Sequence, residues 1–402
     1  MREKPARRER TPLPKGFSVL WTTVAIDITG FGIAIPVLGL FAKREFGASA
    51  FQVGLLIATY SLAQFLLAPV WGRISDRIGR KPVIVVALFG TAVGALITGA
   101  AGALWMLFLG RLIDGGSGAS IAVAQAAATD LAEPHERPRL LGLLGAAFGV
   151  GFSLGPAIAG IAAVIGGARA PFFVASALAL LNAAAAIKRM PETRRHDTEI
   201  ERHLVPELSG SLRRSGVVRL ATISFIGMVA FSGFEATMAL LGERRFSLDE
   251  AGVAWVFVGV GLALVFVQGA MVPRVVPRIG AAMAVRSGYA LDVAGLALLA
   301  VANNWPVLVL SLALLVVGQG LAGPSLTTLI ANRAGNRDRG KALGVQQSFN
   351  AASRIVGPAA AGALFEHVSV GAPYAIGSIV MFLAFVRLLA ERDDSPATVP
   401  AH

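Results

Sequence analysis

Long apolar runs separated by short polar loops repeat along the whole chain. The uncharged stretches 51–71 and 83–109 flank the polar run GRISDRIGRKP, from Gly72 to Pro82. Because roughly 20 predominantly apolar residues suffice to cross a bilayer, we expect this run to be a hinge at a membrane face. The pattern predicts twelve spans, near residues 18–41, 51–71, 83–101, 104–129, 139–165, 171–188, 217–241, 251–272, 282–301, 305–331, 341–366 and 370–390. Backbone groups in lipid must be bonded internally, so runs of this length predict an all-α integral membrane protein.

Composition agrees with a membrane protein and argues against other classes. The chain is 55% hydrophobic and 15% charged, and its 46 glycines suit helices packed closely in lipid. A net charge of +12 ordinarily favours nucleic acid, but these basic residues are sorted by membrane side, so no nucleic-acid partner is expected. The chain has no cysteine, and its five histidines lie in loops, near a helix end or at the terminus, so no metal site is expected. We also expect no enzyme and no cofactor, because no nucleophile–base pair or phosphate loop is visible.

Lysine and arginine predict the orientation. Most of the 36 lie in alternate loops on the side of the N-terminus. The outer loops hold Lys43, Arg44, Arg169, Arg244 and Arg245, and only Arg111 and Arg354 fall deep within spans. The positive-inside rule therefore predicts a multi-pass protein of the cell (plasma or inner) membrane with both termini in the cytoplasm.

The chain also repeats itself. The run ERPRLLGLLGAAFGVGFSLGPAIAG, from Glu136, matches DRGKALGVQQSFNAASRIVGPAAAG, from Asp338, at a constant offset of 202. We expect a cytoplasmic tail (1–16), a six-helix half (17–189), a cytoplasmic linker (190–216), a second six-helix half (217–391) and a C-terminal tail (392–402). Parallel six-helix halves are typical of secondary transporters, whose substrate site lies between the halves near the bilayer midplane.

Four motifs resemble signatures of one family, the major facilitator superfamily (MFS). GRISDRIGRKP resembles its loop 2–3 signature, and LGRLIDGGSGAS, from Leu109, resembles its helix 4 signature, with Asp114 where many relatives carry Gln. The glycines between 142 and 160 resemble the antiporter motif of helix 5, with Ala159 where a second Gly is usual. DITGFGIAIP, from Asp27, resembles the first-helix motif of the drug–proton antiporter branch, which contains the tetracycline exporters. Across the whole chain, the resemblance implies two pseudo-symmetric halves and the proton gradient as energy source.

Charged residues inside the spans are candidates for proton coupling. Asp27 lies roughly 13–15 Å along the first span, near the midplane, where a carboxylate usually marks an ion or substrate pathway. Arg111 has Asp114 at i+3 as a local partner. The resemblance implies that Arg111 modulates the proton affinity of nearby acids. Glu235 is either a second protonation site or an anchor at the mouth, and Asp292 is expected to form a structural pair. The alternatives are a structural role for Asp27 and a purely structural Arg111–Asp114 pair.

The resemblance implies that the loop 2–3 motif is a latch between the halves that holds the outward-facing state. Its members are Gly72, Asp76, Arg77, Gly79, Arg80 and Lys81. Asp76 is expected to accept hydrogen bonds at a helix N-terminus near Gly340. The alternative is solvated charge that only sets topology, which applies most to Arg80 and Lys81.

Two further sets of residues are predicted in the middle of the spans. The glycines of helix 5 are expected to lie close to one stripe of the helix surface and to pack against helix 8 of the other half. This contact would seal a leak path, and Pro156 would permit a kink. The helix 5 set comprises Gly142, Gly151, Gly155, Pro156 and Gly160. The substrate cavity is expected to include Gln347, Asn350 and Arg354, which share a face by i, i+3, i+7 spacing, together with Gln268 and Gln319.

The sequence therefore predicts an antiporter that exports small amphipathic or cationic molecules, such as tetracycline-like drugs, by alternating access. Its expected partners are a small-molecule substrate, protons and the lipid bilayer, and we expect a monomer. Two alternatives stay open: a proton-coupled transporter of a sugar or other metabolite, and a membrane sensor that does not transport.

Overall fold

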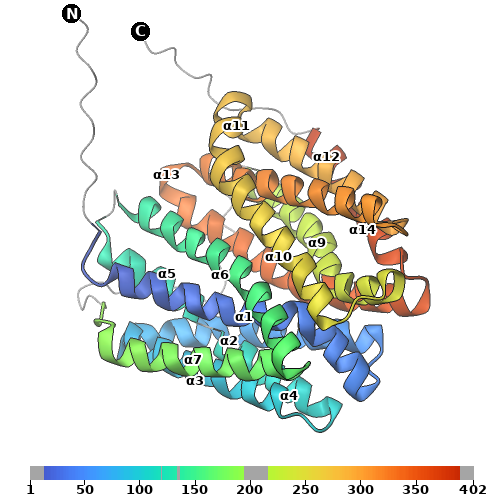
Figure 1. Cartoon of the computed structure of the whole chain (residues 1–402). Helices are drawn as coiled ribbons and strands as arrows, with labels where there is room; N and C mark the ends of the chain where they lie inside the picture. Colours follow the sequence, from blue (N-terminus) through green and yellow to red (C-terminus); the bar gives the residue numbers. More distant parts are fainter. Residues whose placement is uncertain (1–12, 119, 134–135, 194–215, 390–402) are drawn as a thin grey trace, which may run out of the picture.

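The computed structural model describes residues 13–118, 120–133, 136–193 and 216–389, and the ordered elements among them are helices (Figure 1). The expected tails and linker lie largely outside these residues. The first half contains α1 (Phe17–Phe46), α2 (Ala50–Ile78), α3 (Arg80–Gly99), α4 (Leu104–Ser117), α5 (Ser120–Leu131), α6 (Arg137–Gly166) and α7 (Ala170–Arg189). The second half contains α9 (Val217–Phe246), α10 (Glu250–Phe266), the π-helix η1 (Val267–Met271), α11 (Val272–Ile279), α12 (Ala281–Ala300), α13 (Trp305–His367) and α14 (Ala372–Leu389).

Eleven helical stretches among the described residues are long and apolar enough to cross a membrane. The expected twelfth span, 341–366, is the second arm of α13. The Nε2 atom of Gln346 donates a hydrogen bond to Oγ1 of Thr327 at 3.2 Å, whereas a straight helix would separate residues 19 positions apart by about 28 Å. The chain therefore doubles back within α13, and its two arms lie side by side.

Glycines set the tight corners between spans. Gly79 alone separates α2 from α3, with a φ of 108°, and Gly280 alone separates α11 from α12, with a φ of 80°. Both angles lie in the range that favours glycine, because a Cβ atom there strains the backbone. The two corners occupy matching positions in the halves, so they explain why each half retains an Arg-Ile-Gly sequence at this point.

The two halves pack side by side (Figure 1) and make close contact at one end. A single apolar core spans both halves there, and it includes Leu40 and Phe41 of α1 with Leu240 and Leu241 of α9. Across this interface α2 packs against α13 and α6 packs against α10. Gly54 of α2 lies so close to the carbonyl oxygen of Pro358 that a Cβ atom would collide with it. The interface is therefore closed at the end that carries residues 47–49 and 247–249.

The first half has a second apolar core of its own, away from that end. Its members come from α1, α3, α5, α6 and α7, and the described part of the second half contributes none of them. Beyond their own helical turns, no described atom lies within 4 Å of where a Cβ of Gly72 or Gly142 would be. Tight contact between the halves is thus concentrated at one end of the molecule, and the cavities described below lie between that end and the separate core.

Candidate functional site

A break in the fourth span builds one wall of the site. Helix α4 ends at Ser117, Gly118 forms a turn and α5 begins at Ser120, so the helix is interrupted at Gly118 within the continuous span that the hydropathy pattern predicts. Gly115 packs directly on the backbone of Tyr60 in α2, where a Cβ atom would overlap the Tyr60 carbonyl oxygen. Gln64 Nε2 donates to the carbonyl oxygen of Gly118 at 3.0 Å. The amide thus satisfies a backbone acceptor at the break, as a membrane interior requires.

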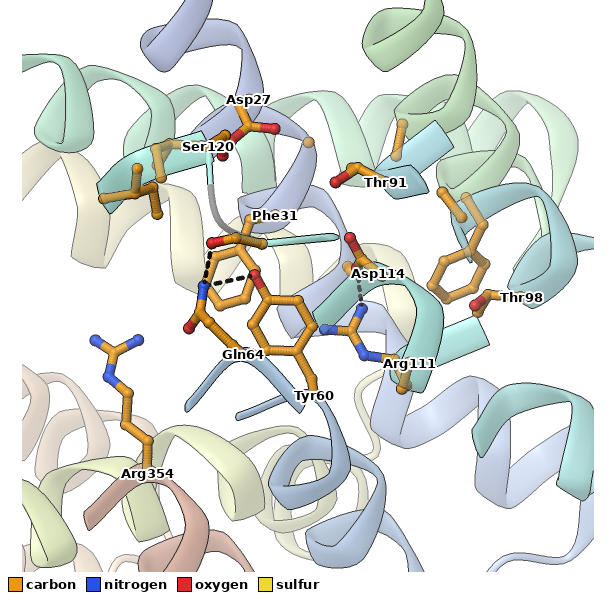
Figure 2. A pocket seen from close by; sticks show the side chains of 18 residues that line it. Asp27, Phe31, Tyr60, Gln64, Thr91, Thr98, Arg111, Asp114, Ser120 and Arg354 are labelled. Atoms are coloured by element: carbon orange, nitrogen blue, oxygen red, sulfur yellow. Dashed lines mark hydrogen bonds and ion pairs between the residues drawn. The ribbon is translucent and has the colours of Figure 1, made fainter. Parts of the chain in front are cut away.

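The break brings Ser120 to Asp27. The Ser120 hydroxyl donates a hydrogen bond to Oδ2 of Asp27 at 2.5 Å, and Figure 2 shows the two side chains meeting at the edge of a cavity. This cavity has a volume of ≈ 100 Å³ and is lined by residues of the first half together with Arg354 of the second half. Asp27 lies about 15 Å along α1 from its first residue, as the sequence analysis predicts for a residue near the midplane. A carboxylate at this depth, with one hydroxyl donor and an open side, is suited to binding a proton or a cationic group.

Arg111 and Asp114 form the predicted local pair on α4. Arg111 Nη1 and Asp114 Oδ2 are 2.9 Å apart, and both residues are buried. The Arg111 guanidinium also lies over the ring of Tyr60, 4.4 Å from its centroid, which is a cation–π geometry. Thr91 of α3 points toward Asp114 from the other side (Figure 2). Arg111 is therefore held by an acid and an aromatic face, and it carries a fixed charge at the wall of the cavity.

The second half contributes Arg354 and Glu235. Both line a smaller cavity of ≈ 40 Å³ between the halves, which shares Phe31, Ala34, Tyr60, Arg111 and Arg354 with the larger one. In Figure 2, Arg354 reaches toward the site from the side opposite Asp27 and is separated from Gln64 by a gap. The two cavities therefore form one polar region in which three acids and two arginines from both halves converge.

The other predicted substrate residues lie outside these two cavities. Gln268 and Gln347 are exposed and Gln319 is half-buried. The Ser224 hydroxyl donates to Oδ1 of Asn350 at 2.8 Å, which ties α9 to α13. Of the five, only Arg354 is brought together with Asp27 and Arg111.

Comparison with known proteins identifies the family. The family model described as Major Facilitator Superfamily matches residues 20–353 and 278–401. The chain belongs to the Major Facilitator Superfamily. It is 32% identical to the class E tetracycline resistance protein of Escherichia coli over 347 residues, covering 83% of this chain and 84% of that protein. It is 28% identical to multidrug resistance protein 1 of Bacillus subtilis over 394 residues, covering 96% of this chain and 97% of that protein.

Solved structures agree on the fold. The human organic anion transporter MFSD10 superposes with a TM-score of 0.71 at 24% identity, covering 96% of this chain and 100% of that one. The nucleoside transporter NupG superposes with a TM-score of 0.79 at 12% identity, covering 93% of this chain and 99% of that one. The chain is a multi-pass membrane transporter of the MFS drug efflux branch, and it is not an enzyme.

The MFS loop 2–3 motif forms a network within the first half. Arg80 pairs with Asp76 at 2.5 Å through Nη1 and with Asp130 of α5 at 2.9 Å through Nε, and it is only 5% exposed. The view of Arg80 as solvated topogenic charge is therefore wrong. Asp76, which was expected to accept hydrogen bonds at a helix N-terminus near Gly340, has its ion pair with Arg80 of its own half in this structure. Glu192 accepts hydrogen bonds from the backbone N–H groups of Arg80 and Lys81 at 2.8 and 3.1 Å, so it caps α3, which sequence reasoning missed.

The remaining motif residues complete this corner. Gly72 and Asp76 lie in the last two turns of α2, Arg77 is exposed on the same turn, and Gly79 is the corner itself.

The helix 5 glycines do not share one partner. A Cβ atom on Gly151 or Gly155 of α6 would lie 2.6–2.8 Å from backbone atoms of α1, in the same half. Gly160 instead faces Ala254 of α10, at 3.2 Å from its Cβ, and Gly142 faces no described atom within 4 Å. The predicted single stripe is wrong because five residues turn a helix by about 500°, so Gly160 points about 140° away from Gly155. Pro156 lies inside α6, between Gly155, which packs on α1, and Gly160, which packs on α10.

Sequence reasoning missed three polar residues of the site, Tyr60, Gln64 and Ser120. Tyr60 and Gln64 lie four residues apart in an apolar span, a spacing that puts them on one helix face, and Ser120 directly follows the glycine-rich break.

Asp292 of α12 is fully buried, and neither of its carboxylate oxygens has a hydrogen-bond partner among the described residues. The structural pair expected for Asp292 is therefore wrong. The Asp292 side chain lies against Gly318 of α13, and a Cβ atom added to Gly318 would collide with Oδ1 of Asp292.

Proposed function

We propose that the chain is a proton-coupled antiporter that exports small amphipathic molecules across the cell membrane by alternating access. Similarity to tetracycline and multidrug resistance proteins along most of the chain supports drug export. The energy source and the substrates are our proposal, as is the assignment of both termini to the cytoplasm, which is supported by the distribution of lysine and arginine.

One observation carries the proposal: the Asp27 carboxylate faces a cavity between the halves while it accepts a hydrogen bond from Ser120. A carboxylate inside a membrane span is costly, and it is retained where a proton or ion must be handled. If Asp27 binds either a proton or a cationic group of the substrate, but not both, the two cargoes exclude each other. Mutually exclusive binding at a site exposed to one side at a time is sufficient for antiport.

The halves, 17–189 and 217–391, would rock about this site, with the linker 190–216 joining them. With the N-terminus inside, the closed end at residues 47–49 and 247–249 faces outward, so the structure corresponds to an inward-facing state. In this scheme the helix 5 glycines support the seal, and the loop 2–3 corner acts as a latch when the inner end closes. A monomer contains all the residues of the proposed pathway.

The test uses protein reconstituted in liposomes with an imposed pH gradient and a panel of tetracyclines, fluorescent dyes and sugars. We expect uphill, gradient-driven transport of a drug or dye by the wild type. Asp27→Asn is expected to abolish uphill transport and to retain downhill exchange, because the amide resembles the neutral carboxyl and cannot release a proton. The matched control is Asp249→Asn, at the N-terminus of α10, where Asp249 accepts from the backbone of Gly252 and asparagine caps equally well.

Two results would contradict the proposal. Uphill transport at the wild-type rate in Asp27→Asn would remove Asp27 from the coupling, and Glu235 would be the next variant to test. Transport of sugars alone would favour the metabolite transporter over a drug exporter.

A further inference from the structure

Arg354 differs from Arg111, the other arginine of the site, in its hydrogen bonding. It projects from the second arm of α13 into both cavities, opposite Asp27, Tyr60 and Gln64 of the first half (Figure 2). No hydrogen bond or ion pair joins its guanidinium to any residue in the part of the chain that the structure describes. Arg111, by contrast, has Asp114 and the ring of Tyr60 as partners. Arg354 therefore presents an open set of five N–H donors to the space between the halves.

An unpaired arginine within a membrane span costs free energy, and this cost is explained if the guanidinium binds a ligand. Arginine stays charged at any accessible pH, and charged residues within membrane spans either pair with one another or mark a substrate pathway. The planar guanidinium matches the geometry of a carboxylate, with two parallel N–H···O bonds. The acid that lines the same small cavity, Glu235, forms no ion pair with Arg354 within 4.0 Å in the described part of the chain. The fork of Arg354 is thus available to a bound molecule, with Glu235 as a competing negative charge nearby.

The surroundings of Arg354 suit an amphipathic ligand. Phe31, Ile35, Leu38 and Ile57 line the small cavity beside it and present apolar surface. Asp27 lies on the far side of the larger cavity, which both halves line. A molecule with an apolar body and an acidic oxygen can place the oxygen on Arg354 and the body against these side chains.

We propose that the cavity binds amphipathic molecules that carry a deprotonated acidic oxygen, such as a carboxylate or an enolate, and that Arg354 is the residue that recognises this group. A zwitterion would then span the site, with its basic group at Asp27. This inference takes the cavity of the proposed function as the substrate site, but it does not depend on proton coupling.

The test measures equilibrium binding to detergent-solubilised protein at fixed pH, without any gradient, so a failure of proton coupling leaves the result unaffected. The probes are a rhodamine dye with a free carboxylate and the methyl ester of the same dye, which differ only in the acidic oxygen. We expect the wild type to bind the free acid about tenfold or more tightly than the ester. Arg354→Gln should remove this preference by weakening binding of the acid alone, and Arg354→Lys should restore part of it because charge remains but the fork is lost.

Glu235→Gln supplies a variant with the opposite expected effect. Removing the competing charge should tighten binding of the free acid and leave the ester unchanged. Arg274→Gln is the control for loss of a positive charge elsewhere, because Arg274 of α11 is exposed and its guanidinium donates to the carbonyl oxygen of Ala270 in the preceding η1. The proposal is overturned if the wild type prefers the ester, if neither dye binds, or if Arg354→Gln weakens both dyes equally while the protein stays monodisperse.

Discussion

Lys43 and Glu243 occupy matching positions in the two halves, 200 residues apart, and their side chains form an ion pair across the interface. The surrounding sequences, AKREF and GERRF, align without a gap, so a perfect repeat would place two like charges opposite each other. Arg44 adds a second bridge, with Nη1 at 2.8 Å from Oε2 of Glu250. The repeat has therefore diverged in charge at the point where its two copies meet, and ion pairs join the halves there instead of like charges facing each other.

Reversing one charge of this pair should open the closed end. Lys43→Glu places two acids side by side, and we expect a cysteine introduced in place of Leu38, a residue lining the small cavity, to be labelled several-fold faster by a reagent added outside. The effect corresponds to about 1 kcal/mol, because the pair is partly exposed. The double reversal, Lys43→Glu with Glu243→Lys, should return labelling to the wild-type rate. Equal labelling in all three proteins would show that the pair does not hold the interface closed.

A second prediction concerns the buried arginine of the loop 2–3 motif. Arg80→Gln leaves Asp76 and Asp130 without their shared cation, and we expect a loss of about 2–3 kcal/mol in stability and a fall of several degrees in Tm. Arg80→Lys should recover part of the loss. Arg73→Gln, at an exposed position of the same motif, should leave the Tm unchanged. Equal Tm values for the Arg73 and Arg80 variants would argue that the network contributes nothing to stability.

A third prediction separates the glycines of α6 by their surroundings. Gly155→Val forces side-chain atoms against the backbone of Gly32, 2.6 Å from the Cβ position, so α1 and α6 must separate and the yield of folded protein should fall sharply. Gly142→Ala has open space and removes a helix-destabilising residue, so stability should be unchanged or rise by up to about 1 kcal/mol. The comparison is made by size-exclusion profile and Tm in detergent. Normal folding of Gly155→Val would refute the close contact between α1 and α6.

Sequence reasoning recovered the spans and the repeat because both depend on hydropathy and on glycine positions, which are local properties. It could not recover which helix face points inward, since lipid is as apolar as a packed interior and leaves no clear amphipathic signal. For this reason Gly151 and Gly155 were assigned to the wrong partner helix, and Tyr60 and Gln64 were overlooked. The turn at Gly118 between α4 and α5 was also missed, because a glycine does not interrupt a hydropathy run.

The pair of Asp27 with Ser120 shows the same limit at the site itself. The costly carboxylate was evident from its position in an apolar span, but its hydrogen-bond donor comes from a residue 93 positions away. Likewise, the i+3 spacing predicted the Arg111–Asp114 pair, whereas the cation–π contact with Tyr60 depends on how α2 packs against α4. Local pairs follow from helix geometry, and contacts between helices require the tertiary structure.

The Arg111–Asp114 pair allows its structural and coupling roles to be tested separately. Arg111→Gln alone leaves Asp114 as an unpaired buried acid, and it should lower the Tm by several degrees, because breaking a buried pair costs about 3–5 kcal/mol. The double variant, Arg111→Gln with Asp114→Asn, removes both charges and keeps similar shapes, so the Tm should return close to that of the wild type. If the pair is purely structural, uphill transport in liposomes should return with the Tm. We expect transport to stay lost in the double variant, because the cavity that Asp27 lines has then lost the fixed charge of Arg111, and full recovery of transport would assign the pair to stability alone.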